Sequence, residues 1–312
     1  MVEKRPIGSR GIEVAPLALG GNVFGWTADE DASFAILDAF VDAGGTMIDT
    51  ADVYTAWVPG HVGGESETVI GKWLKRDPSK RDKVVIATKV GFLEGLAPDK
   101  IAAACDASLK RLGIDRIDLY YQHKDDENVP LADSLGAFER LVDAGKVHAI
   151  GLSQFTAARL DEALETSRRL GLTPVSALQP WYNLVERAKY EDDLRAVAER
   201  HGLAVFPFYS LANGFLTGKY RSKDDLNKSV RGMRNVEYLE GRGMQVLAAL
   251  DEVAAETGAA LATVTLAWTM AQPTITAAIA SATSMPQLAE LLASLQLQLT
   301  PDQVARLDAA SA

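Results

Sequence analysis

The chain has a single cysteine, Cys105, among its 312 residues. One thiol cannot form an internal disulfide, so the stability of the fold does not depend on an oxidising compartment. Cys105 lies in AAACDASLKRL, which has helical spacing, and no neighbour in the sequence indicates a thiolate nucleophile. We therefore expect a small buried side chain at this position.

Positive charge is also scarce, because 32 Lys and Arg residues stand against 42 Asp and Glu residues and the net charge is −10. Binding to a nucleic acid backbone needs concentrated positive charge. The N-terminal MVEKRPIGSRG has no apolar run, and the most apolar later stretch, AALATVTLAWTMA, is too short to span a bilayer. No His, Cys, Asp and Glu residues have metal-ligand spacing. We expect a cytoplasmic protein without a nucleic acid, membrane or metal partner.

No GxGxxG follows an early strand-like run, which disfavours an open doubly wound sheet. Short runs rich in Val, Ile and Leu alternate instead with longer amphipathic stretches, and such runs are typical of strands buried on both faces of a parallel sheet. This alternation predicts a closed (β/α)8 TIM barrel as one domain over residues 1–312. The expected strands are residues 14–21, 45–50, 83–89, 116–122, 146–153, 174–180, 203–210 and 274–281.

Two segments depart from this alternation. Residues 3–14 have the pattern of a small β-hairpin around GSRG, which we expect to cap the bottom of the barrel. Residues 209–240 form a long, charged, Gly-containing loop after the seventh strand. Loops of this length in compact domains are usually functional or mobile.

Four polar residues lie at or just beyond the ends of neighbouring predicted strands. Asp49 ends the second strand, Tyr54 lies five residues on in its loop, Lys89 ends the third strand and His123 follows the fourth. The carboxyl ends of the strands form the active-site face of a (β/α)8 barrel, so all four should meet there. Each alone has an ordinary structural interpretation, but their joint occurrence at these strand ends favours a catalytic site.

These residue types suit proton donation to a carbonyl oxygen. A buried Lys89 next to Asp49 stays charged, because the two charges offset part of the desolvation cost. A cation about 4 Å from a phenol favours the phenolate by roughly 4 kcal/mol, or about 3 pKa units, at an effective dielectric constant of about 20. Tyr54 would then approach the working range of a general acid, and His123 would orient the carbonyl.

The chain resembles the aldo-keto reductase family over nearly its full length. The matching segments are GTMIDTADVY, ATKVG, DLYYQH, GLSQF, ALQPWYNL and FYSLANGFLTGKY. The resemblance implies a barrel that binds an extended nicotinamide cofactor without a Rossmann domain. It further implies that Tyr54 is the proton donor, that Asp49 and Lys89 tune it, and that His123 orients the substrate.

The resemblance also implies how the cofactor is held. Ser153, Gln154 and Gln179 would hold the carboxamide, although the family usually has Asn in place of Gln154, and Tyr209 would stack on the nicotinamide ring. The residues that match the segment over the pyrophosphate are Ser210, Leu211, Asn213, Gly214 and Lys219.

The match is weaker at the adenosine end of the cofactor. Ser281, Thr283 and Gln287 stand at the phosphate-contact positions and none is cationic, while Glu290 is retained and Leu291 replaces a common Asn. A 2′-phosphate held by neutral donors would lose charge-assisted hydrogen bonds of about 1.5–3 kcal/mol each. The family favours NADP(H), and NAD(H) is possible. Arg231 and Arg234 of the long loop are available to fold over the cofactor.

Aromatic residues are concentrated in the loops of the catalytic end and predict an apolar or sugar-like carbonyl substrate. The expected pocket residues are Trp26, Trp57, Phe92, Trp181 and Tyr182, with residues 55–67 shaping one wall.

The function predicted from the sequence is reversible, NAD(P)H-dependent reduction of small aldehydes or ketones to alcohols. One alternative is a Schiff-base aldolase or lyase that uses Lys89 as nucleophile, but a charged Asp49 keeps the amine protonated. The other is a non-catalytic, cofactor-binding regulatory barrel, like the relatives that associate with channels. The sequence does not predict the physiological substrate, the direction of reaction or the oligomeric state.

Overall fold

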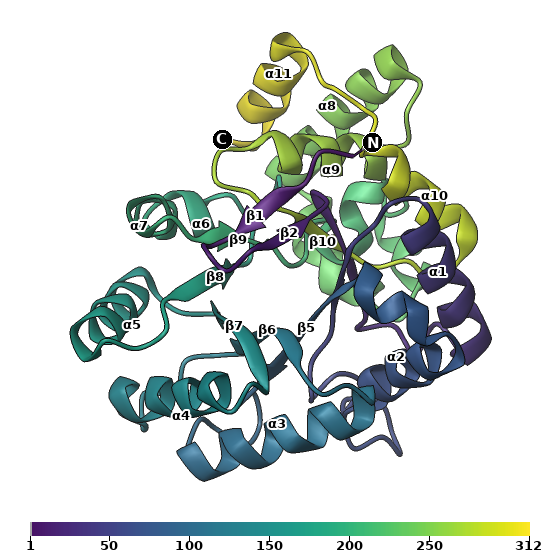
Figure 1. Cartoon of the computed structure of the whole chain (residues 1–312). Helices are drawn as coiled ribbons and strands as arrows, with labels where there is room; N and C mark the ends of the chain where they lie inside the picture. The colour runs from purple at the N-terminus through teal and green to yellow at the C-terminus, as the bar shows by residue number, and fades with distance from the viewer. Residues whose placement is uncertain (1) are drawn as a thin grey trace.

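The computed structural model describes residues 2–312, and a closed sheet of eight parallel strands lies at its centre (Figure 1). The strands are hydrogen-bonded in the order β10-β3-β4-β5-β6-β7-β8-β9. The amides of Thr276 and Ala277 donate to the carbonyl of Val205, so the chain leading into β10 closes the circle against β9. The predicted (β/α)8 barrel is confirmed. Its strands are β3 (Leu17–Gly20), β4 (Met47–Asp49), β5 (Val85–Val90), β6 (Ile117–Gln122), β7 (Val147–Ser153), β8 (Val175–Gln179), β9 (Ala204–Val205) and β10 (Ala278–Ala280).

Helices cover the outside of the sheet, and glycine ends several of them. Gly113, Gly171, Gly202 and Gly258 have left-handed backbone angles directly after a helix, and their amides bond back to the last turn. The helices are α1 (Glu30–Asp42), α2 (Glu65–Arg76), α3 (Pro98–Leu112), α4 (Leu131–Asp143), α5 (Ala157–Leu170), α6 (Ala188–Glu191), α7 (Leu194–His201), α8 (Arg242–Thr257), α9 (Leu261–Ala271), α10 (Met285–Ala293) and α11 (Pro301–Ser311), with a 3₁₀ helix η1 (Pro78–Lys83). Within residues 2–312, no helix has the length and apolar character needed to cross a membrane.

The predicted N-terminal hairpin closes one end of the barrel. Strands β1 (Arg5–Ile7) and β2 (Ile12–Val14) are antiparallel. Ile7, Ile12 and Val14 pack into the same buried cluster as the inward side chains of the barrel strands. The ring of His148, at the start of β7, is 3.0 Å from the carbonyl oxygen of Arg10. The hairpin therefore covers the amino ends of the strands and leaves the carboxyl ends for a site.

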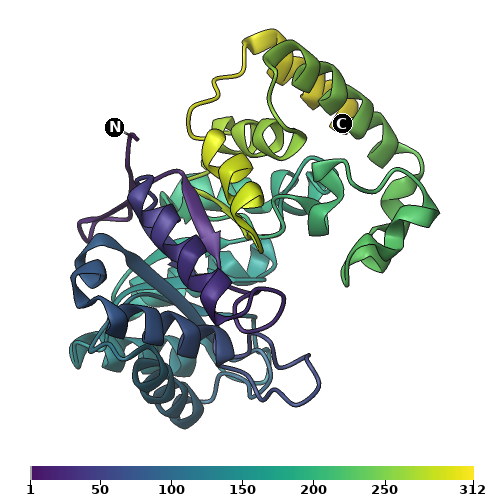
Figure 2. The same ribbon diagram turned by 90° about the vertical axis from the view of Figure 1, so that its right-hand side faces the viewer.

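Strand β9 is shorter than predicted, and the long segment after it is folded rather than open. Pro207 has no N–H to continue the ladder, and Tyr209, Ala212 and Asn213 have positive φ angles of 56°, 46° and 55°. Three 3₁₀ helices follow: η2 (Ala212–Thr217), η3 (Lys223–Lys228) and η4 (Gly232–Leu239). In Figure 2 this green segment lies on the right of the barrel, as do the loops after β3 and β4.

The contact between α2 and α3 depends on a helical glycine. A Cβ on Gly71 would lie 2.1 Å from the carbonyl oxygen of Arg111, whereas one on Gly136, within α4, would meet only the end of the Arg140 side chain at 3.8 Å. We predict that Gly71→Ala lowers the free energy of unfolding by about 1–3 kcal/mol through overpacking. The control Gly136→Ala should raise it by about 0.5–1 kcal/mol. Urea denaturation measures both, and stabilisation by both variants would contradict the close helix contact.

Candidate active site

A buried ammonium group joins a carboxylate to a phenol at the carboxyl ends of the strands. Lys89 Nζ donates to Asp49 Oδ2 at 2.7 Å, to the carbonyl oxygen of Thr50 at 2.8 Å and to the Tyr54 hydroxyl oxygen at 2.7 Å. The Tyr54 hydroxyl in turn donates to Asp49 Oδ2 at 3.3 Å. The His123 ring lies edge-on to the Tyr54 ring, with centroids 6.0 Å apart. The structure therefore brings together all four residues that the sequence singles out.

Strand periodicity explains why these side chains meet. Side chains two residues apart along a strand point to the same face. Met47 and Ala87 lie in the buried cluster inside the barrel, so Asp49 and Lys89, two residues further along β4 and β5, also point inward. Tyr121 places His123 in the same way. The inward face of each strand thus runs from apolar residues to a polar residue at its carboxyl end.

The protonation states follow from burial. Lys89 and Asp49 are 0% and 1% exposed. Burial lowers the pKa of Lys89, but the Asp49 carboxylate opposes that shift, and the ion pair stays charged. Burial, followed by the positive charge of Lys89, lowers the pKa of His123 well below its ordinary value, so its imidazole is neutral.

The phenol of Tyr54 is more basic than the sequence argument predicts. Burial, and then the charge and hydrogen bond of Asp49, raise the pKa of Tyr54 well above its ordinary value. The prediction that Lys89 lowers this pKa is therefore corrected, because Asp49 contacts the same hydroxyl group. Tyr54 is fully protonated at neutral pH, which is the state that a proton donor requires.

Among the residues expected at the nicotinamide end, Gln179 contacts the ion pair directly. Gln179 Nε2 donates to Asp49 Oδ1 at 2.8 Å and Ser153 Oγ donates to the Gln179 carbonyl oxygen at 2.9 Å. Gln154 Nε2 donates to the His123 carbonyl oxygen at 3.0 Å, from a backbone with a φ of 55°. Asp49 therefore has both carboxylate oxygens satisfied by neighbouring side chains.

The segment expected over the pyrophosphate holds donors and a cation. Tyr209 lies edge-on to Trp181 with centroids 5.3 Å apart, and Ser210 Oγ donates to the Pro207 carbonyl oxygen. Lys219 Nζ lies against Gly214, and no carboxylate within residues 2–312 is within 4.0 Å of it. Asn213 Oδ1 is buried and has no hydrogen-bond partner among the residues that the structure describes, and Leu211 packs against the core. An unpaired cation beside a left-handed turn fits a phosphate group.

The residues expected at the adenosine end are neutral and bonded to protein groups. Ser281 Oγ donates to Asn22 Oδ1 at 2.9 Å, and Thr283 donates to Gln287 Oε1 through its amide and its hydroxyl group. The Glu290 side chain is exposed on α10. These contacts place no cation among the residues expected to meet a 2′-phosphate.

Comparison with known proteins agrees with this arrangement. The Aldo/keto reductase family model matches residues 16–312. The chain belongs to the aldo/keto reductase family. Proteins of this family are oxidoreductases that generally use NAD(P)H, and the predicted family is confirmed.

Relatives with different functional names match nearly the whole chain. The uncharacterized oxidoreductase YrpG of Bacillus subtilis is 33% identical, covering 94% of this chain and 91% of the relative. The L-glyceraldehyde 3-phosphate reductase of Escherichia coli is 29% identical, covering 98% and 92%. A probable voltage-gated potassium channel subunit beta of Oryza sativa is also 29% identical, covering 99% and 96%.

Aromatic rings from the loops expected to form the substrate pocket surround Tyr54 and His123. Trp57 lies edge-on to Tyr54 at 6.2 Å and to Trp26 at 5.7 Å, measured between centroids, and Phe92 lies 4.9 Å from His123. Trp181 lies beside Tyr209.

Tyr182 does not lie with these rings, so its assignment to the pocket is wrong. It is buried against Tyr190 and Trp268, and its hydroxyl group donates to Glu191. Adjacent residues in extended backbone point in opposite directions, which turns Tyr182 away from the side that Trp181 occupies.

The sequence argument misses a second pair of acidic residues near Lys89, namely Glu67 and Asp52. Glu67 is fully buried and accepts from Thr88 Oγ1 at 2.6 Å and from Arg111 Nε at 2.7 Å. The Asp52 amide donates to the Lys89 carbonyl oxygen at 3.2 Å, and its Oδ1 is buried without a hydrogen-bond partner among residues 2–312. Burial, and then the Glu67 carboxylate, raises the pKa of Asp52 to about 7. The position of Glu67 on the apolar face of α2, beside Ile70, is the signal that could have revealed it.

The raised pKa of Asp52 predicts a pH-dependent stability. The folded-state pKa exceeds the unfolded value of about 4, so ionisation of Asp52 opposes folding fully above pH 7 and progressively less below it. Asp52→Asn should raise the free energy of unfolding by about 2–4 kcal/mol at pH 8 and by roughly a third of that at pH 5. Urea denaturation at both pH values measures the difference. A gain that does not vary with pH would mean that packing, not charge, is responsible.

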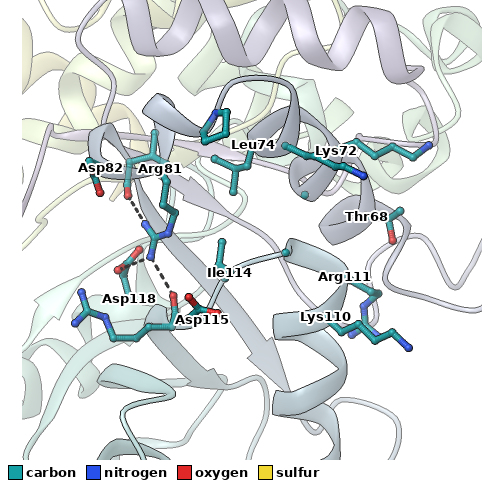
Figure 3. A pocket seen from close by; sticks show the side chains of 16 residues that line it. Thr68, Lys72, Leu74, Arg81, Asp82, Lys110, Arg111, Ile114, Asp115 and Asp118 are labelled. Carbon is teal, nitrogen blue, oxygen red and sulfur yellow. Dashed lines mark hydrogen bonds and ion pairs between the residues drawn. The ribbon is translucent and has the colours of Figure 1, made fainter.

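A hollow of about 840 Å³ lies elsewhere on the molecule, between α2, η1 and the loop that joins α3 to β6 (Figure 3). Arg81 donates to Asp118 at 2.9 Å across it. Asp118 and Val84 lie at the amino ends of β6 and β5, on the opposite side from Lys89. The hollow is therefore separate from the candidate active site.

Proposed function

We propose that the protein is an NAD(P)H-dependent oxidoreductase that reversibly reduces small aldehydes or ketones to alcohols. The observation that carries this proposal is the contact of one buried ammonium, Lys89, with both Asp49 and the protonated phenol of Tyr54. Family membership supports it, and the name of the Escherichia coli relative specifies an aldehyde substrate for that protein.

Each residue has a separate role in carbonyl reduction. A bound reduced nicotinamide would supply the hydride that the carbonyl carbon accepts. Tyr54 donates its proton to the carbonyl oxygen, and the Lys89 ammonium group stabilises the phenolate that remains. Asp49 keeps Lys89 charged and in place. The neutral His123 imidazole, which lies edge-on to the Tyr54 ring, would orient the carbonyl group.

The cofactor would lie along the residues expected from the family. Ser153, Gln154 and Gln179 would hold the carboxamide, Tyr209 would stack on the ring, and the loop that ends at Lys219 would cover the pyrophosphate. We propose NADPH as the slightly preferred cofactor on family grounds. NADH should serve as well, because Ser281, Thr283 and Gln287 offer a 2′-phosphate neutral groups only.

The two alternatives have less support. A Schiff-base mechanism needs an unprotonated Lys89, yet this amine donates to three oxygen atoms and forms an ion pair with Asp49. One relative is named as a potassium channel subunit, which would agree with a regulatory barrel. A barrel without catalytic activity, however, does not need an intact proton-donating group. We further propose a cytoplasmic location and a small-molecule substrate, without a nucleic acid partner.

The phenol provides the direct test of this function. Tyr54→Phe should lower kcat for aldehyde reduction by about 10²- to 10⁴-fold, because the proton donor is lost. Stopped-flow and steady-state assays with a reactive aldehyde measure the change. Tyr120→Phe is the control, because Tyr120 is a buried phenol that packs against Phe138 and its hydroxyl group has no partner in the described part of the chain. Its turnover should stay near that of the unsubstituted protein.

Fluorescence titration with NADPH and NADH should accompany these assays. Both cofactors should bind the Tyr54→Phe variant as they bind the unsubstituted protein, with dissociation constants for the two within about tenfold of each other. Full turnover in Tyr54→Phe would remove Tyr54 from its proposed role.

A further inference from the structure

Asp52 carries a carboxyl group that has no role in the proposed reaction so far. Its amide donates to the carbonyl oxygen of Lys89 at 3.2 Å, which ties the loop after β4 to the carboxyl end of β5. The residue is half-buried, and its Oδ1 atom is buried without a hydrogen-bond partner among residues 2–312. A buried carboxylate oxygen is normally hydrogen-bonded, so the charged form of Asp52 is costly at this position.

The neighbouring carboxylate of Glu67 is paired, in contrast to that of Asp52. Glu67 is fully buried on α2 and accepts from Thr88 Oγ1 at 2.6 Å and from Arg111 Nε at 2.7 Å. The only ion pair of Arg111 within residues 2–312 is the one with Glu67. Asp52 therefore meets the repulsion of a nearby negative charge and has no arginine of its own.

Other ionisable groups around Asp52 keep their charge state near neutral pH. Burial raises the pKa of Cys105 on α3 to about 12 and the pKa of Tyr120 on β6 well above its ordinary value, so both groups are neutral. Arg111 stays a cation, because arginine does not deprotonate in proteins. His61, in the same loop as Asp52, is of a residue type that ordinarily titrates in this range, and it needs a control of its own.

A charge on Asp52 reaches the proton donor through Lys89. The ammonium group of Lys89 donates to Asp49 and to the hydroxyl oxygen of Tyr54, each at 2.7 Å. Burial lowers the pKa of this amine, and the charges of Asp49, Asp52 and Glu67 oppose that shift. A further negative charge near the ammonium group also offsets part of the stabilisation that the group gives to the phenolate of Tyr54.

We propose that Asp52 is a positioning residue that acts through Lys89 and sets the pH range in which Tyr54 donates its proton most readily. This inference rests on the proposed reductase function. With a proton on Asp52, the positive charge of Lys89 acts on the phenol undiminished, and Tyr54 is the stronger acid. Loss of that proton adds a negative charge and weakens the acid. Asp52 keeps its own proton during turnover, because the proton that reaches the carbonyl oxygen is that of Tyr54.

The direction of the effect on the rate follows from these charges. Burial, and then the Glu67 carboxylate, raise the pKa of Asp52 to about 7, so the neutral form is present below that pH. Carbonyl reduction should therefore be faster below pH 7 than above it, by about three- to tenfold in kcat. The pKa of Tyr54 lies well above its ordinary value, so Tyr54 itself produces no step in this range.

The pH profile of kcat for reduction of 4-nitrobenzaldehyde with NADPH tests the proposal, from about pH 5.5 to about pH 8.5. The unsubstituted protein should show a step with its midpoint near pH 7. Asp52→Asn should show no step and should keep the faster rate at alkaline pH. A purely structural role would change the rate equally at every pH, and a step that persists in Asp52→Asn would overturn the proposal.

Glu67→Gln tests the origin of the midpoint. It removes the repelling charge and leaves the Arg111 cation near Asp52, so the step should move to lower pH by about one unit or more. A midpoint that stays in place, or moves to higher pH, would contradict the coupling between the two carboxyl groups.

Two further variants serve as controls. His61→Gln removes the histidine of the same loop and should retain the step, whatever its effect on the overall rate. Asp99→Asn removes an exposed carboxylate from the first turn of α3 and should change neither the rate nor the midpoint. Loss of the step in His61→Gln, together with its retention in Asp52→Asn, would assign the titration to His61 and overturn the proposal.

A measurement without turnover separates this proposal from the reductase function. NMR of the free protein with ¹⁵N-labelled lysine follows the Nζ resonance of Lys89, which is identified by its absence in Lys89→Met. The resonance should shift with a midpoint near pH 7 and should stay constant in Asp52→Asn. Such a shift, without reduction of any aldehyde, would contradict the reductase function and retain the coupling. A Lys89 resonance that does not respond to Asp52 would overturn the coupling, even in an active reductase.

Discussion

The contact between Lys89 and Asp49 is the interaction on which the rest of the site depends. Two opposite charges are held inside the barrel, with Lys89 fully buried. Removing one partner from such a pair generally costs about 3–5 kcal/mol, because the remaining charge stays buried. Gln179 holds the second oxygen of Asp49, and Lys89 reaches Tyr54. The protein therefore maintains a charged pair whose ammonium group also contacts the hydroxyl group of Tyr54.

The fold makes room for this pair at one end of the barrel and excludes water at the other. Small inward side chains, such as Ala87, Ala149 and Ala177, fill the barrel together with the hairpin residues Ile7 and Ile12. The polar residues follow at the carboxyl ends of the same strands. The aromatic rings and the 209–240 segment then add the substrate and cofactor contacts from loops, which can vary without disturbing the barrel.

Local sequence patterns were sufficient to predict the barrel, the hairpin and the meeting of Asp49, Lys89 and His123. Strand periodicity fixes both the buried face and the end at which a polar residue emerges. Strand periodicity was not sufficient to predict features that depend on the distances between side chains from separate elements. The direction of the Tyr54 pKa shift depends on Asp49 being 3.3 Å from the hydroxyl group, and the Asp52–Glu67 group is formed by residues from separate elements. The position of Arg231 against Trp26 depends on the path of a long loop.

A double-mutant cycle on kcat/KM tests the central claim most directly, using Lys89→Met, Tyr54→Phe and the combined variant. If Lys89 acts through the phenol, its loss should matter little once the phenol is absent, because residues that act as a unit are not additive. The combined variant should then lie within about tenfold of Tyr54→Phe alone. Losses that multiply across the two substitutions would contradict the account, because Lys89 and Tyr54 would then act independently.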